Sequence, residues 1–307
     1  MARIRIRSPY RVLIGDALES MRGLPEKSVH TCVTSPPYFG LRDYQAKGQI
    51  GLEDTPDDYV ARLVQVFREV RRVLRDDGTL WLNLGDSYTS GGRATRAPDE
   101  KHGAREMGFR AATPDGLKPK DLIGIPWRVA FALQADGWYL RQDIIWHKPN
   151  PMPESVRDRC TKAHEYVFLL SKGPRYYFDS EAIKEPTQSD RAPSRKAKKA
   201  GAGRFELRGN GTPYDGTGET RNRRSVWTVA TRPFKGAHFA TFPPDLIEPC
   251  ILAGSPAGGV VLDPFGGSGT TAGVAVKHGR RAILCEINPE YAAMIPARVD
   301  SITKGKK

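Results

Sequence analysis

Short apolar runs alternate along the chain with longer segments whose apolar residues recur every three or four positions. The short runs are typical of buried strands, and the longer pattern is typical of amphipathic helices. A chain in which the two alternate is expected to form a mostly parallel sheet covered by helices. Strands are predicted at 12–15, 29–34, 79–84, 139–146, 166–170, 260–263 and 282–286. Helices are predicted at 57–74, 120–134, 244–253, 270–278 and 289–299.

Two stretches interrupt this alternation. Residues 87–119 are rich in Gly, Arg and Pro and have little apolar periodicity, which predicts a long active-site loop or a partly ordered insertion. Residues 186–237 are rich in Gly, Arg and Ser, and on composition alone they are also typical of a linker. They divide the chain into the parts 1–185 and 238–307. Pro296 falls inside the last predicted helix, and we expect it to kink or end that helix.

Composition narrows the class of protein. With 39% hydrophobic and 27% charged residues, the chain has the composition of an ordinary soluble globular protein. No apolar run approaches the roughly 18 residues of a membrane span, and the N-terminus alternates Arg with Ile, unlike a signal peptide. A cytoplasmic protein without membrane contact is therefore expected. The 4 cysteines and 6 histidines are widely spaced, so neither a disulfide framework nor a metal site is indicated.

The charge is uneven along the chain. The formal net charge is +13, and residues 187–235 hold 12 Lys and Arg against 4 Asp and Glu. A concentration of positive charge in so short a segment is expected of a module that contacts nucleic acid. The basic residues that we expect at DNA phosphates are Lys148, Arg195, Lys196, Lys198, Lys199, Arg221, Arg223 and Arg224.

A diproline motif, Thr34-Ser35-Pro36-Pro37-Tyr38, directly follows the predicted strand 29–34. Taken alone it is equally typical of a rigid turn, because proline fixes φ and restrains the residue before it. It also suits chemistry on the exocyclic amine of a base, which needs hydrogen-bond acceptors on its N–H groups before it can attack a methyl group. The Ser35 hydroxyl and the Pro36 carbonyl are candidate acceptors. Tyr38 offers an aromatic face to a base extruded from the duplex.

A second motif runs from an apolar strand through a glycine-rich turn into a helix: Val260-Val261-Leu262-Asp263-Pro264-Phe265-Gly266-Gly267-Ser268-Gly269-Thr270-Thr271. This architecture holds nucleotide-like ligands at the carboxyl end of a strand. The Gly-Lys-Ser/Thr signature of a phosphate loop is absent. An acidic residue before the glycines suits a ligand with a positive amino group, such as S-adenosylmethionine. Glu286, about twenty residues on, follows the next strand and suits both ribose hydroxyls.

Together these motifs resemble the amino-methyltransferases of bacterial restriction–modification systems. The catalytic motif precedes the cofactor motif, as in their beta group. Three further blocks are similar to that family: Ile145-Trp146-His147-Lys148-Pro149-Asn150-Pro151-Met152-Pro153-Glu154-Ser155, His164-Glu165-Tyr166, and His238-Phe239-Ala240-Thr241-Phe242-Pro243-Pro244. The resemblance covers roughly residues 11 to 295, apart from the two irregular stretches.

The resemblance implies an α/β, Rossmann-like fold with a seven-stranded, mostly parallel sheet and one reversed strand. It implies a catalytic part at 1–185, a target-recognition region at 186–237 and a cofactor-binding part at 238–307, with some recognition in 87–119. It implies Ser35, Pro36, Pro37 and Tyr38 as catalytic residues. The residues implied to line the S-adenosylmethionine site are Asp16, Ser35, His238, Phe239, Thr241, Phe242, Asp263, Pro264, Phe265, Gly266, Gly267, Ser268, Gly269, Thr270, Glu286 and Asn288.

The expected activity is methyl transfer from S-adenosylmethionine to N4 of a cytosine flipped out of duplex DNA. Family members with Ser at the position of Ser35 mostly act on cytosine. Because both base amines need the same acceptors, methylation of adenine N6 is the alternative. An RNA base or a protein amide as the substrate, and a catalytically inactive DNA-binding protein, are more distant alternatives. Partners compatible with the resemblance are a second copy of the chain and a cognate restriction endonuclease acting on the same site.

Pro249-Cys250 is similar to the nucleophile motif of cytosine-C5 methyltransferases. Because it falls inside a predicted helix among Leu246, Ile247 and Ile251, we expect Cys250 to be a core residue.

Overall fold

The computed structural model describes residues 8–41, 46, 48–89, 113, 115–186, 220–231 and 242–305, together with the backbone of 95–96 and 105–106. Its helices and strands follow one another in the order β1 (Tyr10–Ile14), α1 (Ala17–Arg22), β2 (Val29–Thr34), α2 (Pro56–Val73), β3 (Leu74–Leu84), β4 (Thr95–Arg96), β5 (Arg105–Glu106), α3 (Ile125–Ala135), β6 (Tyr139–His147), β7 (His164–Ser171), η1 (Glu181–Ile183), β8 (Glu185–Pro186), β9 (Thr220–Arg221), β10 (Val226–Thr228), α4 (Pro244–Gly254), β11 (Val260–Asp263), α5 (Thr270–Lys277), β12 (Arg281–Glu286) and α6 (Pro289–Thr303). Among the described residues, no helix combines the length and apolar character needed to cross a membrane.

The central sheet has the strand order β1-β12-β11-β2-β3-β7-β6-β10. β7 is antiparallel to both of its neighbours, and every other pair in this sheet is parallel. All seven predicted strands are present, and the prediction of one reversed strand is confirmed. The eighth strand, β10, was not predicted. It is three residues long, comes from the stretch 186–237, and extends the sheet beside β6.

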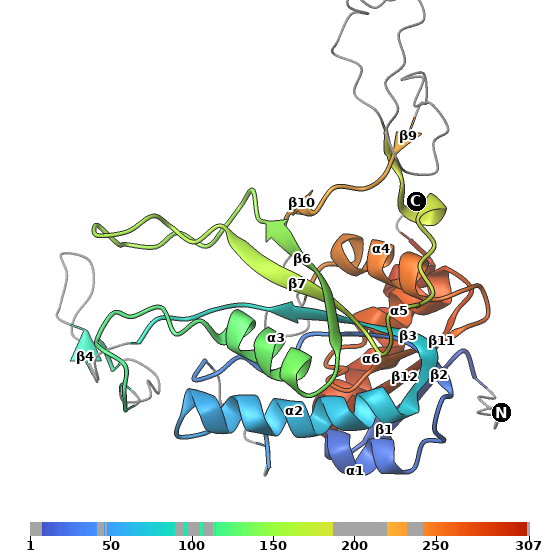
Figure 1. Ribbon diagram of the computed structural model, residues 1–307, viewed down its shortest axis with the longest axis horizontal. Helices are drawn as coiled ribbons and strands as arrows, with labels where there is room; N and C mark the ends of the chain where they lie inside the picture. The colour runs from blue at the N-terminus through green and yellow to red at the C-terminus, as the bar shows by residue number, and fades with distance from the viewer. Residues whose placement is uncertain are drawn as a thin grey trace, which may run out of the picture.

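Helices cover both faces of this sheet. α1, α2 and α3 pack on one face and α4, α5 and α6 on the other, and Figure 1 shows α2 and α3 well separated from α4 and α5. Successive residues of the central strands face opposite layers: Leu80 and Leu82 join the first core, whereas Trp81 joins the second. Both faces of the sheet are therefore buried, which explains why the central strands are continuous apolar runs in the sequence.

The start of α2 follows from local chemistry. The Thr55 side chain caps the helix by accepting from the Asp58 N–H at 3.1 Å, and Pro56 occupies the first turn, where it loses no hydrogen bond. The predicted apolar stripe is buried, with Leu63, Phe67 and Val70 fully enclosed. The observed helix therefore lies within about one residue of the predicted range.

Two helix predictions need correction. α3 begins at Ile125 rather than at 120, because Gly124 adopts a left-handed conformation (φ 79°) and starts the helix there. α6 continues through Pro296 to Thr303, so the expectation that this proline ends the helix was wrong. Proline removes only one backbone donor, and Ile295 and Val299 are buried on either side of it, so tertiary packing carries the helix onward.

Both irregular stretches are closed where they leave the fold. β8 and β9 pair antiparallel, Glu185 with Arg221 and Pro186 with Thr220, so the chain departs and returns at one place. The stretch after β3 is closed by a bridge between Tyr88 and Leu122. Insertions anchored in this way leave the core unchanged.

A buried hydrogen-bonded node joins β2 to β11. The Thr34 hydroxyl donates to one oxygen of Asp263, and the Thr271 hydroxyl donates to the other, each at 2.6 Å. The backbone N–H of Phe265 also donates to Asp263, at 3.0 Å. Asp263 is only 1% exposed, and this burial raises its pKa to about 6, although all three hydrogen bonds favour the carboxylate.

This pKa predicts a pH-dependent stability. Because the folded pKa lies above the ordinary value of about 3.9, the folded state takes up a proton that the unfolded state releases. The resulting stabilisation is complete below about pH 4 and is lost as the pH rises through about 6. Relative to Asp263→Asn, we expect the wild type to lose up to about 3 kcal/mol of unfolding free energy between about pH 4 and pH 7. Urea unfolding of both proteins at several pH values measures this, and a difference independent of pH would contradict it.

Candidate active site

The carboxyl ends of the parallel strands meet at one edge of the sheet, which we call the carboxyl edge. Both predicted motifs lie there, because β2 and β11 are neighbours in parallel register, with Leu262 opposite Cys32. β7 runs the other way, so its first residues also lie at this edge, with Tyr166 opposite Leu84 of β3. The site therefore collects loops from strands that are far apart in the sequence.

The diproline motif forms a rigid turn after β2. Pro36 is buried and Ser35 is partly exposed. The Pro37 carbonyl accepts a hydrogen bond of 2.8 Å from the Tyr59 hydroxyl of α2, which fixes the motif to the helix layer. Among the described residues, no donor contacts the Pro36 carbonyl, and its role as an acceptor stays a prediction.

Tyr38 belongs to a polar network at the carboxyl edge. Its hydroxyl donates to Glu165 at 2.7 Å, and the Ser35 hydroxyl donates to Tyr38 at 3.5 Å. Glu165 also accepts from the Asn83 amide at 3.2 Å and forms an ion pair with Lys148. Burial and the Glu165 charge raise the pKa of Tyr38, so its hydroxyl stays protonated and remains a donor.

The Tyr38 ring is held as firmly as its hydroxyl. A Cβ added at Gly85 would lie 2.5 Å from Cε2 of the ring, so only glycine lets the ring occupy this place. The network and this contact together fix the orientation of Tyr38 beside Ser35.

Sequence reasoning missed two members of this network. Asn83 lies in an otherwise apolar strand, and a buried amide within such a run could have marked it. Glu165 lies in the block His164-Glu165-Tyr166, but nothing local links it to Tyr38. Lys148, expected at a DNA phosphate, is instead paired with Glu165, and its ammonium lies 4.3 Å from the centre of the Trp146 ring.

Two glycines of the glycine-rich turn pack closely against neighbouring side chains. A Cβ at Gly266 would lie 2.8 Å from Leu284, and one at Gly269 would lie 2.8 Å from Ile295. Gly267 differs: its φ is 49°, and the nearest atom to an added Cβ would be the Phe265 carbonyl oxygen at 4.0 Å. Thr270 begins α5 directly after the turn. The turn is thus packed tightly on the protein side and open at Gly267.

Glu286 closes this turn from the next strand. Its carboxylate accepts from the Gly267 N–H at 2.7 Å and from the Asn288 N–H at 2.8 Å, and each oxygen retains capacity for a further donor. Burial raises the pKa of Glu286. The Ser268 hydroxyl is buried and has no partner among the described residues. An orphaned hydroxyl, an open glycine and a carboxylate with spare acceptor capacity fit a hydroxyl-bearing ligand.

Three carboxylates end adjacent strands: Asp16 after β1, Glu286 in β12 and Asp263 in β11. Burial and these three charges raise the pKa of Cys285 to about 12. Such an edge suits a cationic ligand. Asp16 also caps α1 by accepting from the Glu19 N–H at 3.1 Å. The sequence suggested that Asp263 contacts a ligand ammonium directly. In the structure, both of its oxygens accept hydrogen bonds from the protein and the residue is almost fully enclosed.

The described basic residues of 186–237 have local partners. Arg221 and Arg224 both pair with Glu185, at 2.8 and 2.6 Å. Arg223 lies 4.7 Å from the centre of the Trp227 ring. These contacts tie the base of the insertion to the fold.

Other predicted residues lie outside the described part of the chain: Arg195, Lys196, Lys198, Lys199, His238, Phe239 and Thr241. Phe242 is described and packs against the core that contains α4 and α5. Cys250 is 1% exposed, and burial raises the pKa of its thiol, which confirms that it is a core residue.

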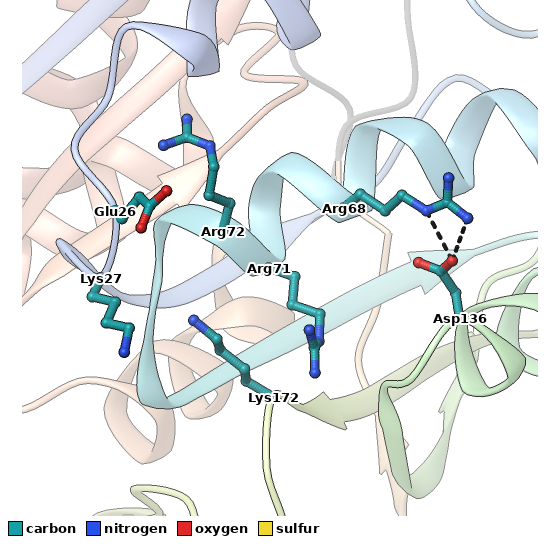
Figure 2. Close-up of a pocket in the computed structure, with 7 residues that line it drawn as sticks. All are labelled: Glu26, Lys27, Arg68, Arg71, Arg72, Asp136 and Lys172. Carbon is teal, nitrogen blue, oxygen red and sulfur yellow. Dashed lines mark hydrogen bonds and ion pairs between the residues drawn. The ribbon is translucent and has the colours of Figure 1, made fainter.

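A hollow of about 370 Å³ lies at the opposite edge of the sheet (Figure 2). Its lining is mostly basic, but Arg68 pairs with Asp136 at 2.5 Å and Lys27 pairs with Asp76 at 2.9 Å. Arg72 donates to the carbonyls of Met21 and Leu24. These cations hold α2 to the surrounding loops, and the hollow is remote from both motifs.

Known proteins are similar in sequence to most of this chain. The N6/N4 methyltransferase family model, described as DNA methylase, matches residues 29–296. The type II methyltransferase M.SmaI of Serratia marcescens is 52% identical over 94% of this chain and 90% of its own length. The type II methyltransferase M.Cfr9I of Citrobacter freundii is 54% identical over 90% of this chain and 83% of its own length.

Solved structures share the fold. A protein of Thermus thermophilus assigned as a DNA modification methylase, in complex with S-adenosyl-L-methionine, has a TM-score of 0.60 at 26% identity and covers 97% of both chains. PvuII DNA methyltransferase, which is cytosine-N4-specific, has a TM-score of 0.63 at 20% identity and covers 97% of this chain and 95% of its own. The chain belongs to the DNA methylase family and is an S-adenosylmethionine-dependent DNA amino-methyltransferase of the type II restriction–modification kind.

Proposed function

We propose that this enzyme methylates N4 of a cytosine flipped out of duplex DNA. The observation that carries the proposal is the Thr34–Asp263 hydrogen bond, which holds the acceptor-bearing Ser35 and the glycine-rich turn on neighbouring strands. The target amine and the methyl donor then meet at one place on the carboxyl edge. Ser35, rather than an acidic residue, at the first position of the diproline motif favours cytosine.

The cofactor half of the site is proposed to be formed by the ends of β1, β11 and β12. Glu286 would accept hydrogen bonds from the ribose hydroxyls, and the open Gly267 and orphaned Ser268 would lie against the amino-acid part. Asp16 would lie near the adenine, and residues 238–242 would complete the pocket. We further propose that Asp263 acts by holding the turn in place, since its own oxygens are already bonded. When bound, S-adenosylmethionine supplies an electrophilic methyl group.

The target half activates the amine. A cytosine N4 lone pair is delocalised into the ring, and acceptors on its two N–H groups draw it toward a tetrahedral arrangement that can attack. The Pro36 carbonyl and the Ser35 oxygen are suited to be those acceptors. The Ser35 oxygen lies 3.5 Å from the Tyr38 hydroxyl, and its lone pairs are suited to accept from the amine. Glu165 and Lys148 keep Tyr38 in place, so the acceptors are ordered before the base arrives.

Adenine N6 is the second candidate, because it presents an amine beside a ring nitrogen just as cytosine does. Ser35 can accept from either amine, and its neutral, short side chain excludes neither base. The preference for cytosine therefore rests on the identity of this one residue.

DNA contact is proposed for residues 187–235, whose excess of basic residues would bind phosphates. The recognition of base edges is proposed for the same insertion, which returns to the sheet through β10 beside β6, and for 87–119, which follows β3 at the carboxyl edge. A second copy of the chain and a cognate endonuclease remain proposed partners.

Cofactor binding and catalysis should be separable. We expect Glu286→Gln to weaken S-adenosylmethionine binding about tenfold to a hundredfold, because it replaces a charged acceptor. Ser35→Ala should leave that binding intact and slow methyl transfer about tenfold to a thousandfold, the scale of losing one positioned hydrogen-bonding group. Calorimetry and single-turnover transfer measure the two effects. Glu290→Gln, the same change at an exposed neighbouring position, is the control; cofactor affinity unchanged in Glu286→Gln would remove its assignment.

The basic insertion should supply salt-dependent DNA affinity. Replacing Arg195, Lys196, Lys198 and Lys199 with Gln should flatten the plot of log K against log salt by about 0.9 for each phosphate that is no longer neutralised. Fluorescence anisotropy of a labelled duplex at several salt concentrations measures the slope. A variant that loses the exposed Arg22 and Lys304 serves as the control. An unchanged slope in the fourfold variant would mean that these residues do not contact phosphates.

The methylated atom can be identified directly. Plasmid DNA from cells that express the enzyme should yield N4-methylcytosine after digestion to nucleosides, as measured by mass spectrometry. N6-methyladenine alone would replace the proposal by its second candidate. 5-Methylcytosine would contradict the site itself, because that product needs a reactive thiolate, and Cys250, in the motif similar to that of cytosine-C5 methyltransferases, is buried.

A further inference from the structure

Met152 is unusual among the apolar side chains that the structure describes. It is 85% exposed, more than any other large hydrophobic residue in that part of the chain. It lies in the loop 148–163 between β6 and β7, with a proline on each side. Single exposed apolar side chains are common on protein surfaces, so the position and the setting of Met152 must decide whether it has a role.

The loop rises from the carboxyl edge, next to the target half of the site. Lys148, at its start, pairs with Glu165, which accepts from the Tyr38 hydroxyl. Four residues of chain reach at most about 14 Å, so Met152 lies within that distance of the Lys148 backbone. Figure 1 shows the loop projecting beyond the sheet after β6.

The loop is braced on both sides of Met152. The Asn150 amide donates to the Thr231 carbonyl at 3.1 Å, and the Thr231 N–H donates back to Asn150 at 2.9 Å. Glu154 pairs with Arg159 at 2.7 Å. Arg159 in turn lies 4.0 Å from the centre of the Tyr88 ring, in the facing loop. Flanking prolines restrict the backbone further, so little conformational entropy remains to be lost when the loop binds.

Charge identifies the partner. Residues 148–163 hold four basic and two acidic side chains. Both acidic ones are paired, Glu154 with Arg159 and Asp158 with Lys120. Lys148 is paired with Glu165, so Arg157 and Lys162 carry the remaining positive charge of the loop. Arg157 is exposed, and the structure records no partner for it among the described residues. An apolar tip on a basic, stiff loop suits a polyanion with a hydrophobic interior, which is duplex DNA.

We propose that Met152 is a wedge that enters the duplex at the target site and fills the space left by the flipped base. The proposal rests on the proposed function, because it requires a base to leave the stack. Extruding a base costs the free energy of its stacking and pairing. Apolar side chains inserted between bases recover part of that free energy. Pro151 and Pro153 restrict the backbone of the loop, and the Met152 side chain fills the space left by the base.

The test measures base extrusion. The target sequence is first read from methylated plasmid DNA, and a duplex of that sequence carries 2-aminopurine, which fluoresces when unstacked, at the target position opposite thymine, with which it pairs. We expect Met152→Ala to lower the fluorescence increase on binding and to slow methylation of the ordinary duplex about tenfold to a hundredfold, because an inserted apolar side chain no longer recovers part of the unstacking cost. Met152→Leu should restore most of both. Phe131→Ala, which removes another exposed apolar side chain on α3, should change neither.

A second substrate distinguishes insertion of Met152 into the duplex from a contact with the DNA surface. When the target base is mispaired, extrusion costs less, so the defect of Met152→Ala should shrink severalfold on that duplex. An equal defect on paired and mispaired duplexes, or an unchanged fluorescence increase, would overturn the proposal. A changed particle mass in solution with normal extrusion would make Met152 a contact between copies of the chain, which also overturns it. Wild-type methylation of the duplex tests the proposed function separately, because it does not depend on the variant.

Discussion

The buried contact of Asp263 with Thr34 and Thr271 holds the two halves of this enzyme together. It joins the end of β2, which carries the diproline motif, to the end of β11, which carries the glycine-rich turn. A carboxylate enclosed this completely would be costly without donors on both oxygens. Here three donors satisfy it, and each one belongs to a part of the site that must be positioned. Stability and geometry therefore depend on the same group.

Electrostatics divides the carboxyl edge in two. Asp16, Asp263 and Glu286 concentrate negative charge at the ends of β1, β11 and β12, where a cationic cofactor is proposed. On the other side, Glu165 is neutralised by Lys148, and the loop beyond it is basic. The same edge can thus attract a sulfonium compound at one end and a polyanion at the other. The strand order, rather than any local motif, produces this separation.

The parts proposed to meet DNA are attached to the fold at narrow, fixed points. The insertion after β8 closes through the β8–β9 pair and through Glu185, which binds Arg221 and Arg224. The loop with Met152 is closed by the Lys148 N–H, which donates to the Ala163 carbonyl at 2.8 Å, and it is braced by the contact of Asn150 with Thr231. Such anchoring lets the recognition segments change in length and sequence while the catalytic sheet stays the same.

Much of this protein was determined by local sequence. The seven main strands and both motifs could be predicted because apolar periodicity and glycine or proline turns act over a few residues, whereas the reversed strand was implied only by the family resemblance. Other features were decided only by the tertiary structure. β10 is too short to have a pattern, and α6 passes Pro296 because its neighbours are buried. The pairing of Tyr38 with Glu165 spans 127 positions, and that of Thr34 with Asp263 spans 229. Contacts between residues so far apart depend on the order of strands in the sheet, which no local pattern specifies.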